Sequence, residues 1–77
     1  NQIMATEVEP DYDFQSAKWE LDDGRCLIIE RAAGPGTDGY NTIVTEADGG
    51  AAPTDVLAED VDERAADKAA REWLTDT

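Results

Sequence analysis

The sequence has no histidine, one cysteine and only two lysines, Lys18 and Lys68. Histidine is the commonest metal ligand and the commonest acid–base group near neutral pH, so its absence disfavours catalysis and transition-metal binding. Because Cys26 is alone, no disulfide can form within the chain, and the disulfide-rich class of small secreted proteins is excluded. The longest apolar run, residues 26–29, is far shorter than the roughly 20 residues that span a membrane.

The beginning of the sequence shows no signal-peptide pattern, so we expect a cytoplasmic protein. Residues 1–3 precede Met4 and are interpreted as a tag remnant. We expect residues 1–13 to form a flexible acidic segment, and residues 14–77 to form one small domain, because 77 residues suffice for one domain at most.

Negative charge dominates what is present. The chain has 19 acidic and 6 basic residues, a formal net charge of −13 and twelve alanines. The acids are spread from Glu7 to Asp76 without a block of five or six. Dispersed acid with little lysine is typical of a halophilic, for example haloarchaeal, protein whose self-repulsion is screened by high concentrations of monovalent cations. The alternatives are mimicry of nucleic-acid phosphates, an ordinary acidic mesophilic protein and a local patch for a basic partner.

A β-hairpin is the clearest structural signal. The stretch "FQSAKWEL" alternates apolar and polar residues, "DDG" follows, and "RCLIIER" is rich in strand formers. A three-residue turn would place Trp19 opposite Leu27 and Ala17 opposite Ile29, whereas a two-residue turn would place Trp19 opposite Ile28. We favour the three-residue turn because it gathers the apolar side chains on one face.

The rest of the chain predicts one more strand and a C-terminal helix. Residues 40–46, "YNTIVTE", predict a strand because positions 42–45 are all β-branched, and residues 56–58 fit either a short fourth strand or the first turn of the helix. The helix is expected from about Val61 to Leu74, with Asp60 and Glu63 as a capping-box-like start. Its apolar stripe contains Val61, Ala65, Ala69 and Trp73, with Ala66, Ala70 and Leu74 beside it. The predicted fold is α+β, a three-stranded or four-stranded antiparallel meander packed against one helix.

No pattern in the sequence predicts a catalytic, cofactor-binding or metal-binding residue. We interpret Cys26 as a small buried apolar residue. The carboxylates match no calcium loop, and "GPGTDG" (residues 34–39) lacks the lysine and hydroxyl residue of a phosphate-binding loop. We therefore expect a protein that is not an enzyme.

The sheet face that carries Cys26 and Ile28 has no second helix to cover it, which predicts a homodimer or a protein partner. The expected function is a non-enzymatic protein-interaction or regulatory module. The alternative is a nucleic-acid-associated protein, with Lys18, Arg25 and Arg31 on one hairpin face, or an acidic nucleic-acid mimic. The predicted partner-binding residues are Lys18, Cys26, Ile28, Arg31, Thr37, Asp38 and Tyr40.

Overall fold

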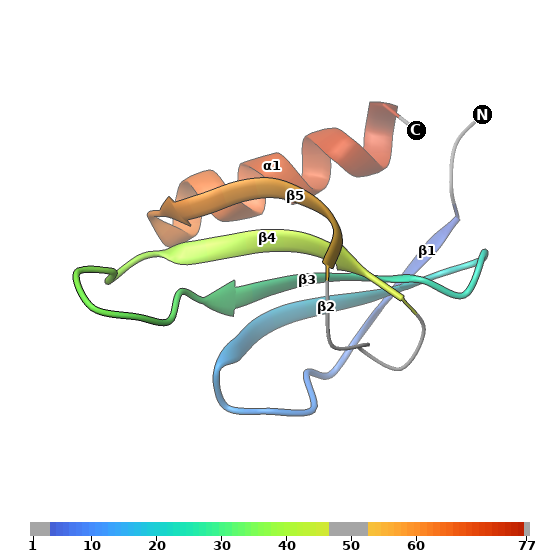
Figure 1. Ribbon diagram of the computed structural model, residues 1–77. Helices are drawn as coiled ribbons and strands as arrows, with labels where there is room; N and C mark the ends of the chain where they lie inside the picture. Colours follow the sequence, from blue (N-terminus) through green and yellow to red (C-terminus); the bar gives the residue numbers. More distant parts are fainter. Residues whose placement is uncertain (1–3, 47–52, 77) are drawn as a thin grey trace.

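The computed structural model describes residues 4–46 and 53–76, which form one antiparallel β-sheet with an α-helix on one of its faces (Figure 1). The strands follow one another in the sheet in sequence order, so the sheet is a meander. The predicted α+β class is confirmed, with five strands where three or four were expected. The elements are β1 (Ala5–Val8), β2 (Gln15–Leu21), β3 (Cys26–Arg31), β4 (Tyr40–Thr45), β5 (Pro53–Val61) and α1 (Glu63–Asp76).

Strand β1 lies inside the segment 1–13 that was expected to be flexible. It pairs antiparallel with β2, from Ala5 opposite Leu21 to Val8 opposite Lys18. A strand of four residues is too short to show a clear alternation of apolar and polar residues in the sequence. Its position is decided by the edge of β2, which offers backbone donors and acceptors that need partners.

The register of the hairpin β2–β3 agrees with the prediction from the three-residue turn. Trp19 lies opposite Leu27, and Ala17 lies opposite Ile29. Gly24, in the turn, has a φ of +94°, which is the left-handed region that glycine adopts without a steric penalty. The turn therefore places the large apolar residues of both strands on the same face.

Residues 56–58, whose assignment the sequence left open, belong to strand β5. This strand pairs with β4 through several register shifts and curves strongly over the sheet (Figure 1). Near its end Asp60 has a φ of +52°, and its Oδ1 accepts a hydrogen bond from the N–H of Gly39 at 2.9 Å. A Cβ atom at Gly39 would lie 2.6 Å from the carbonyl oxygen of Val61, so β5 approaches this point too closely for any other residue.

Helix α1 begins at Glu63, two residues after the predicted start at Val61. Its N-terminal cap is Asp62, whose Oδ1 accepts a hydrogen bond from the N–H of Ala65 at 2.7 Å. The predicted cap at Asp60 is therefore wrong. The strand continues to Val61, and the Asp60 carboxylate already accepts a hydrogen bond from Gly39, the residue before β4.

Alanines of α1 face the sheet, as predicted, but the helix is rotated relative to the expected stripe. Ala66 and Ala70 are completely buried, whereas Ala65 is exposed. The buried hydroxyl of Thr42 on β4 donates a hydrogen bond to the carbonyl oxygen of Ala66 at 2.8 Å, which fixes the helix against the sheet. Trp73 is half-buried against the same core.

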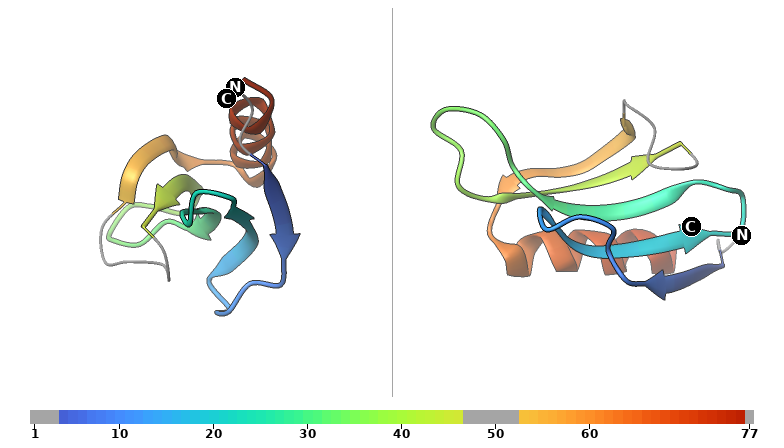
Figure 2. Two further views of the ribbon diagram at one scale, coloured as in Figure 1. Left: turned by 90° about the vertical axis from the view of Figure 1, so that its right-hand side faces the viewer. Right: turned by 90° about the horizontal axis from the view of Figure 1, so that it is seen from below.

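The sheet has two different faces (Figure 2). The face toward α1 carries the main core, and its buried residues are Trp19, Leu21, Leu27, Ile29, Val44, Ala66 and Ala70. A separate buried cluster consists of Cys26, Ile28 and Ile43. The strand registers place these three residues on the face that α1 leaves uncovered. Over the ranges 4–46 and 53–76, no helix has the length and apolar character needed to cross a membrane.

Candidate binding hollow on the uncovered sheet face

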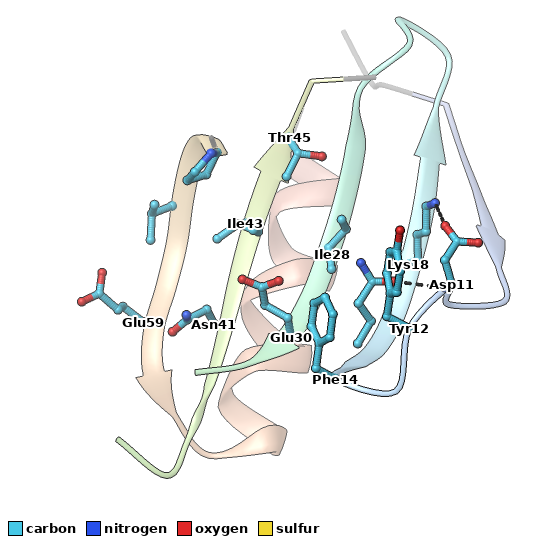
Figure 3. Close-up of a pocket in the computed structure, with 13 residues that line it drawn as sticks. Asp11, Tyr12, Phe14, Lys18, Ile28, Glu30, Asn41, Ile43, Thr45 and Glu59 are labelled. Atoms are coloured by element: carbon cyan, nitrogen blue, oxygen red, sulfur yellow. Dashed lines mark hydrogen bonds and ion pairs between the residues drawn. The ribbon is translucent and has the colours of Figure 1, made fainter. Parts of the chain in front are cut away.

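A hollow of about 440 Å³ lies on the sheet face opposite α1 (Figure 3). It extends from the β1–β2 connection, across β2, β3 and β4, to β5. We refer to it as the hollow. Its lining residues are Asp11, Tyr12, Phe14, Gln15, Lys18, Ile28, Glu30, Asn41, Ile43, Thr45, Pro53, Val56 and Glu59.

The floor of the hollow is a row of side chains that crosses β2, β3, β4 and β5. The registers align Lys18 with Ile28, Ile28 with Ile43, and Ile43 with Val56. Ile28 and Ile43 are 3% and 9% exposed, whereas Val56 on the edge strand is 49% exposed. Because paired residues of neighbouring strands lie on the same face, this row gives the hollow an apolar centre.

Two stacked aromatic rings stand at one end of the hollow. The centroids of Tyr12 and Phe14 are 5.3 Å apart, with an interplanar angle of 12°. Backbone hydrogen bonds hold the connection that carries them, because Gln15 N–H donates to the carbonyl of Tyr12 at 3.0 Å and Arg31 N–H donates to the carbonyl of Phe14 at 2.8 Å. The rings are therefore attached to the end of β3, although both are exposed to solvent.

Lys18 is the cationic residue of the hollow, and Asp11 neutralises it. Its Nζ lies 2.6 Å from Asp11 Oδ2, and its side chain is 12% exposed. The hydrogen bond to Asp11 raises the pKa of Lys18 above its ordinary value, partly offset by burial, so the lysine stays charged. Lys18 therefore does not offer a free positive charge to a ligand.

Glu30 carries a negative charge into the hollow without such compensation. Its side chain is half-buried beside the apolar floor (Figure 3). Within residues 4–46 and 53–76 it has no hydrogen-bond or ion-pair partner. Burial raises the pKa of the Glu30 carboxyl above that of an ordinary glutamate, because loss of water penalises the charged form. A cation placed here would relieve that penalty.

Three of the seven predicted partner-binding residues lie together on this face. Lys18 and Ile28 line the hollow, and Cys26 is buried beside them in the cluster with Ile28 and Ile43. At 6% exposure Cys26 is a small buried residue, as predicted. It supports the floor and does not reach a ligand.

The other four predicted residues lie away from the hollow. Arg31 and Tyr40 face each other at the end of the β3–β4 pair, and Tyr40 packs against the main core. Thr37 and Asp38 belong to the β3–β4 connection, where the Thr37 hydroxyl donates to the carbonyl of Gly34 at 2.7 Å. Thr37 and Asp38 were predicted to bind a partner, but neither lines the hollow on the uncovered face.

The prediction of partner-binding residues missed the aromatic pair, Glu30 and Val56, which line the hollow from distant parts of the sequence. The alternation of β3 already placed Glu30 on the same face as Ile28. No sequence signal could bring the β1–β2 connection next to it, because that contact depends on how the connection docks on β3.

The basic residues proposed as a nucleic-acid face are not gathered by the fold. Lys18 lies on the uncovered face and is paired with Asp11. Arg25 is paired with Asp23, its guanidinium Nη2 lying 2.8 Å from Asp23 Oδ2, and Arg31 lies at the far end of β3. In the described part of the chain, no group of three or more Cys, Asp and Glu side chains is arranged to hold a metal ion.

Comparisons with protein-family models, with curated proteins and with solved structures find no match to this chain.

Proposed function

We propose that the chain is a non-enzymatic interaction module that binds a protein partner through the hollow. The observation that supports this most is the distribution of exposed apolar side chains. Among the described residues, four large hydrophobic side chains are exposed, and three of them line the hollow: Tyr12 at 61%, Phe14 at 48% and Val56 at 49%. Exposed apolar side chains gathered in a polar-rimmed depression are typical of a binding surface.

Charge favours a different protein over a second copy of this chain. A second copy would bring a surface on which acidic residues outnumber basic ones, 19 to 6 in the whole chain, into contact with Glu30 and Glu59. Like charges placed opposite one another disfavour an interface. A partner segment that combines apolar and basic side chains complements both the floor of the hollow and its charge.

We also propose that the acidity is an adaptation to a salt-rich cytoplasm. Self-repulsion from a net charge of −13 destabilises a compact domain, and at about 1 M salt the repulsion is screened within about 3 Å. Under such conditions a partner cannot be attracted from a distance. Binding then depends on contacts made within the hollow itself.

The test is selection of binders from a library of random peptides of about 12 residues, displayed on phage and presented with the folded chain in about 2 M KCl. The affinities of the selected peptides are then compared among three proteins. These are the wild type, the double variant Tyr12→Ser/Phe14→Ser, and the control Met4→Ser. Met4 is also exposed, at 69%, but does not line the hollow.

We expect the double variant to lose binding by at least about tenfold and the Met4 variant to keep it. Absence of enriched peptides, or peptides that bind the double variant as tightly as the wild type, would contradict the proposal. Sedimentation of the wild type tests whether a second copy of this chain occupies the hollow instead. A dimer that Phe14→Ser dissociates would identify the partner as a second copy of this chain.

A further inference from the structure

The protein itself shows how it accommodates an arginine next to an aromatic ring. The guanidinium of Arg71 on α1 lies over the ring of Trp19, 5.9 Å from its centroid. Arg71 Nε is also 2.9 Å from Asp67 Oδ2. The cation thus contacts both an aromatic ring and a carboxylate, and each contact favours the charged guanidinium.

A second arginine is held in the same way at the β2–β3 turn. The guanidinium of Arg25 lies 5.8 Å from the ring centroid of Trp73, and its Nη2 is 2.8 Å from Asp23 Oδ2. Both arginines therefore have two kinds of partner, an aromatic ring and an aspartate. Both arrangements lie between the C-terminal part of α1 and the β2–β3 hairpin, with the arginine on the helix in one and next to the hairpin turn in the other.

The hollow contains the same two kinds of partner without the cation. The Phe14 ring is 48% exposed and stacks on Tyr12, and the half-buried Glu30 carboxylate has no partner among the described residues. Lys18, the nearby cation, is already bound to Asp11. Figure 3 shows the Phe14 and Glu30 side chains over the same part of the floor.

We propose that an arginine side chain of the partner protein enters the hollow, with its guanidinium against the Phe14–Tyr12 rings and hydrogen-bonded to the Glu30 carboxylate. This inference rests on the proposed function and specifies the chemistry of the partner. The apolar floor of Ile28, Ile43 and Val56 receives aliphatic side chains that flank the arginine.

Arginine fits this site better than lysine. The guanidinium is planar, so it can stack on a ring and present parallel N–H groups to a carboxylate at the same time, whereas an ammonium is a compact and strongly hydrated charge. High salt favours arginine further, because it screens the long-range attraction that both cations feel and leaves the stacking contact of the guanidinium in place. The half-buried carboxylate of Glu30 is also less screened than a fully exposed one.

The probes are blocked peptides with the core Val-Xaa-Val, in which Xaa is arginine, lysine or citrulline. Citrulline has nearly the shape of arginine but no charge. Affinity is measured by titrating each peptide into the full ¹⁵N-labelled chain and following the amide signals of residues that line the hollow. We expect the arginine peptide to bind at least about tenfold more tightly than the other two, in both low salt and about 2 M KCl.

The protein variants separate the two contacts of the guanidinium. Glu30→Gln removes the charge with little change in shape, and Phe14→Leu removes the ring and keeps an apolar side chain. Each is expected to weaken the arginine peptide about tenfold and to leave the citrulline peptide nearly unchanged. The matched control is Glu20→Gln, an exposed carboxylate of the same sheet face that does not line the hollow.

The outcomes distinguish this inference from the proposed function. Equal binding of all three peptides, or full arginine affinity in Glu30→Gln, overturns the arginine site. If library-selected peptides bind the hollow but are not enriched in arginine, the proposed function stands and the inference is wrong. If neither library nor designed peptides shift any signal of the hollow, both are wrong.

Discussion

Asp60 Oδ1 accepts a hydrogen bond from the backbone N–H of Gly39 at 2.9 Å and so joins the end of β5 to the start of β4. A second hydrogen bond joins the same two segments, because the Asp60 N–H donates to Asn41 Oδ1 at 2.8 Å. This position costs Asp60 some conformational free energy, because its φ of +52° lies in the left-handed region. Few residues other than glycine, asparagine and aspartate adopt that region. These bonds set where β5 ends and where α1 can begin.

Gly39→Ala is expected to destabilise the fold by about 1–3 kcal/mol. The new Cβ would lie 2.6 Å from the carbonyl oxygen of Val61 and 2.8 Å from the carbonyl carbon of Asp60, and both are backbone atoms that cannot move independently. Urea unfolding followed by tryptophan fluorescence measures the change. Asp60→Asn is the control, because its side-chain oxygen can still accept the Gly39 hydrogen bond. A Gly39→Ala protein as stable as wild type would rule out the close approach.

Thr42→Val is expected to lower the free energy of unfolding by about 1 kcal/mol. The substitution keeps the shape of the side chain but removes the buried hydroxyl that donates to Ala66 O at 2.8 Å. Thr54→Val is the matched control, because the Thr54 hydroxyl donates to Val44 O at 3.1 Å from an exposed position on β5. Thermal unfolding of both variants gives the comparison. If both variants lose the same free energy of unfolding, the hydrogen bond from Thr42 to the helix contributes no more than the bond from Thr54.

Glu30→Gln is expected to raise the free energy of unfolding at neutral pH. Burial raises the pKa of the Glu30 carboxyl, so the folded state binds this proton more tightly than the unfolded chain. Its stabilising contribution is present below the pKa of an unfolded glutamate and is lost as pH rises through the folded pKa. Glutamine resembles the protonated form and avoids that loss.

Urea unfolding of wild type and Glu30→Gln between about pH 3 and about pH 8 tests this prediction. The two curves should converge below about pH 4, where the glutamate is protonated in both states, and separate above it. Glu20→Gln, which removes an exposed carboxylate of the same face, corrects for the change in net charge. A constant difference at all pH values would show that the ionisation of Glu30 does not matter.

Salt is expected to stabilise the protein strongly. With a net charge of −13, the free energy of unfolding should increase from low salt to about 2 M KCl, because screening weakens repulsion among the carboxylates. Urea unfolding followed by circular dichroism at several KCl concentrations measures how steeply the free energy of unfolding rises with salt. A triple variant with Asp13→Asn, Asp22→Asn and Glu46→Gln, all exposed positions, should be more stable in low salt and show a smaller slope. An unchanged slope would mean that KCl acts through something other than charge screening.

Arg71→Met is expected to destabilise the fold by about 0.5–1 kcal/mol. The methionine keeps apolar contact with Trp19 but loses both the cation–π contact and the ion pair to Asp67. Arg64→Met on the same helix is the control, because Arg64 has no ion pair among the described residues. Thermal unfolding at high salt makes the comparison under conditions where exposed pairs contribute least. If the two substitutions destabilise the fold equally, the contacts of Arg71 with Trp19 and Asp67 do not stabilise it and no longer support an arginine site in the hollow.

The β2–β3 hairpin could be predicted in detail from the sequence because all of its information is local. The alternation in "FQSAKWEL" and the "DDG" turn together fix which residues share a face, and Trp19 does lie opposite Leu27. The order of the elements and the α+β class follow from similar local patterns. The burial of Cys26 was also predicted, because a lone cysteine in a run of strand formers behaves as a small apolar residue.

The helix shows where local information ends. The sequence placed alanines on one face, but it could not decide whether Ala65 or Ala66 points to the sheet, since both are equally small and apolar. The rotation is decided by contacts with β4, where Thr42 binds the Ala66 carbonyl. Likewise, the helix start depends on Asp60, whose carboxylate is used by Gly39 across the sheet.

The sequence by itself determined the strand alternation, the hairpin turn, the helical alanine run and the charge, because each depends on neighbours within a few residues. The tertiary structure alone decided the β1 pairing, the curvature of β5 and the docking of the aromatic pair beside Glu30. These features join residues from Asp11 to Glu59 in one hollow. Such contacts depend on which backbone edges remain open once the hairpin has formed, and that is a property of the assembled sheet.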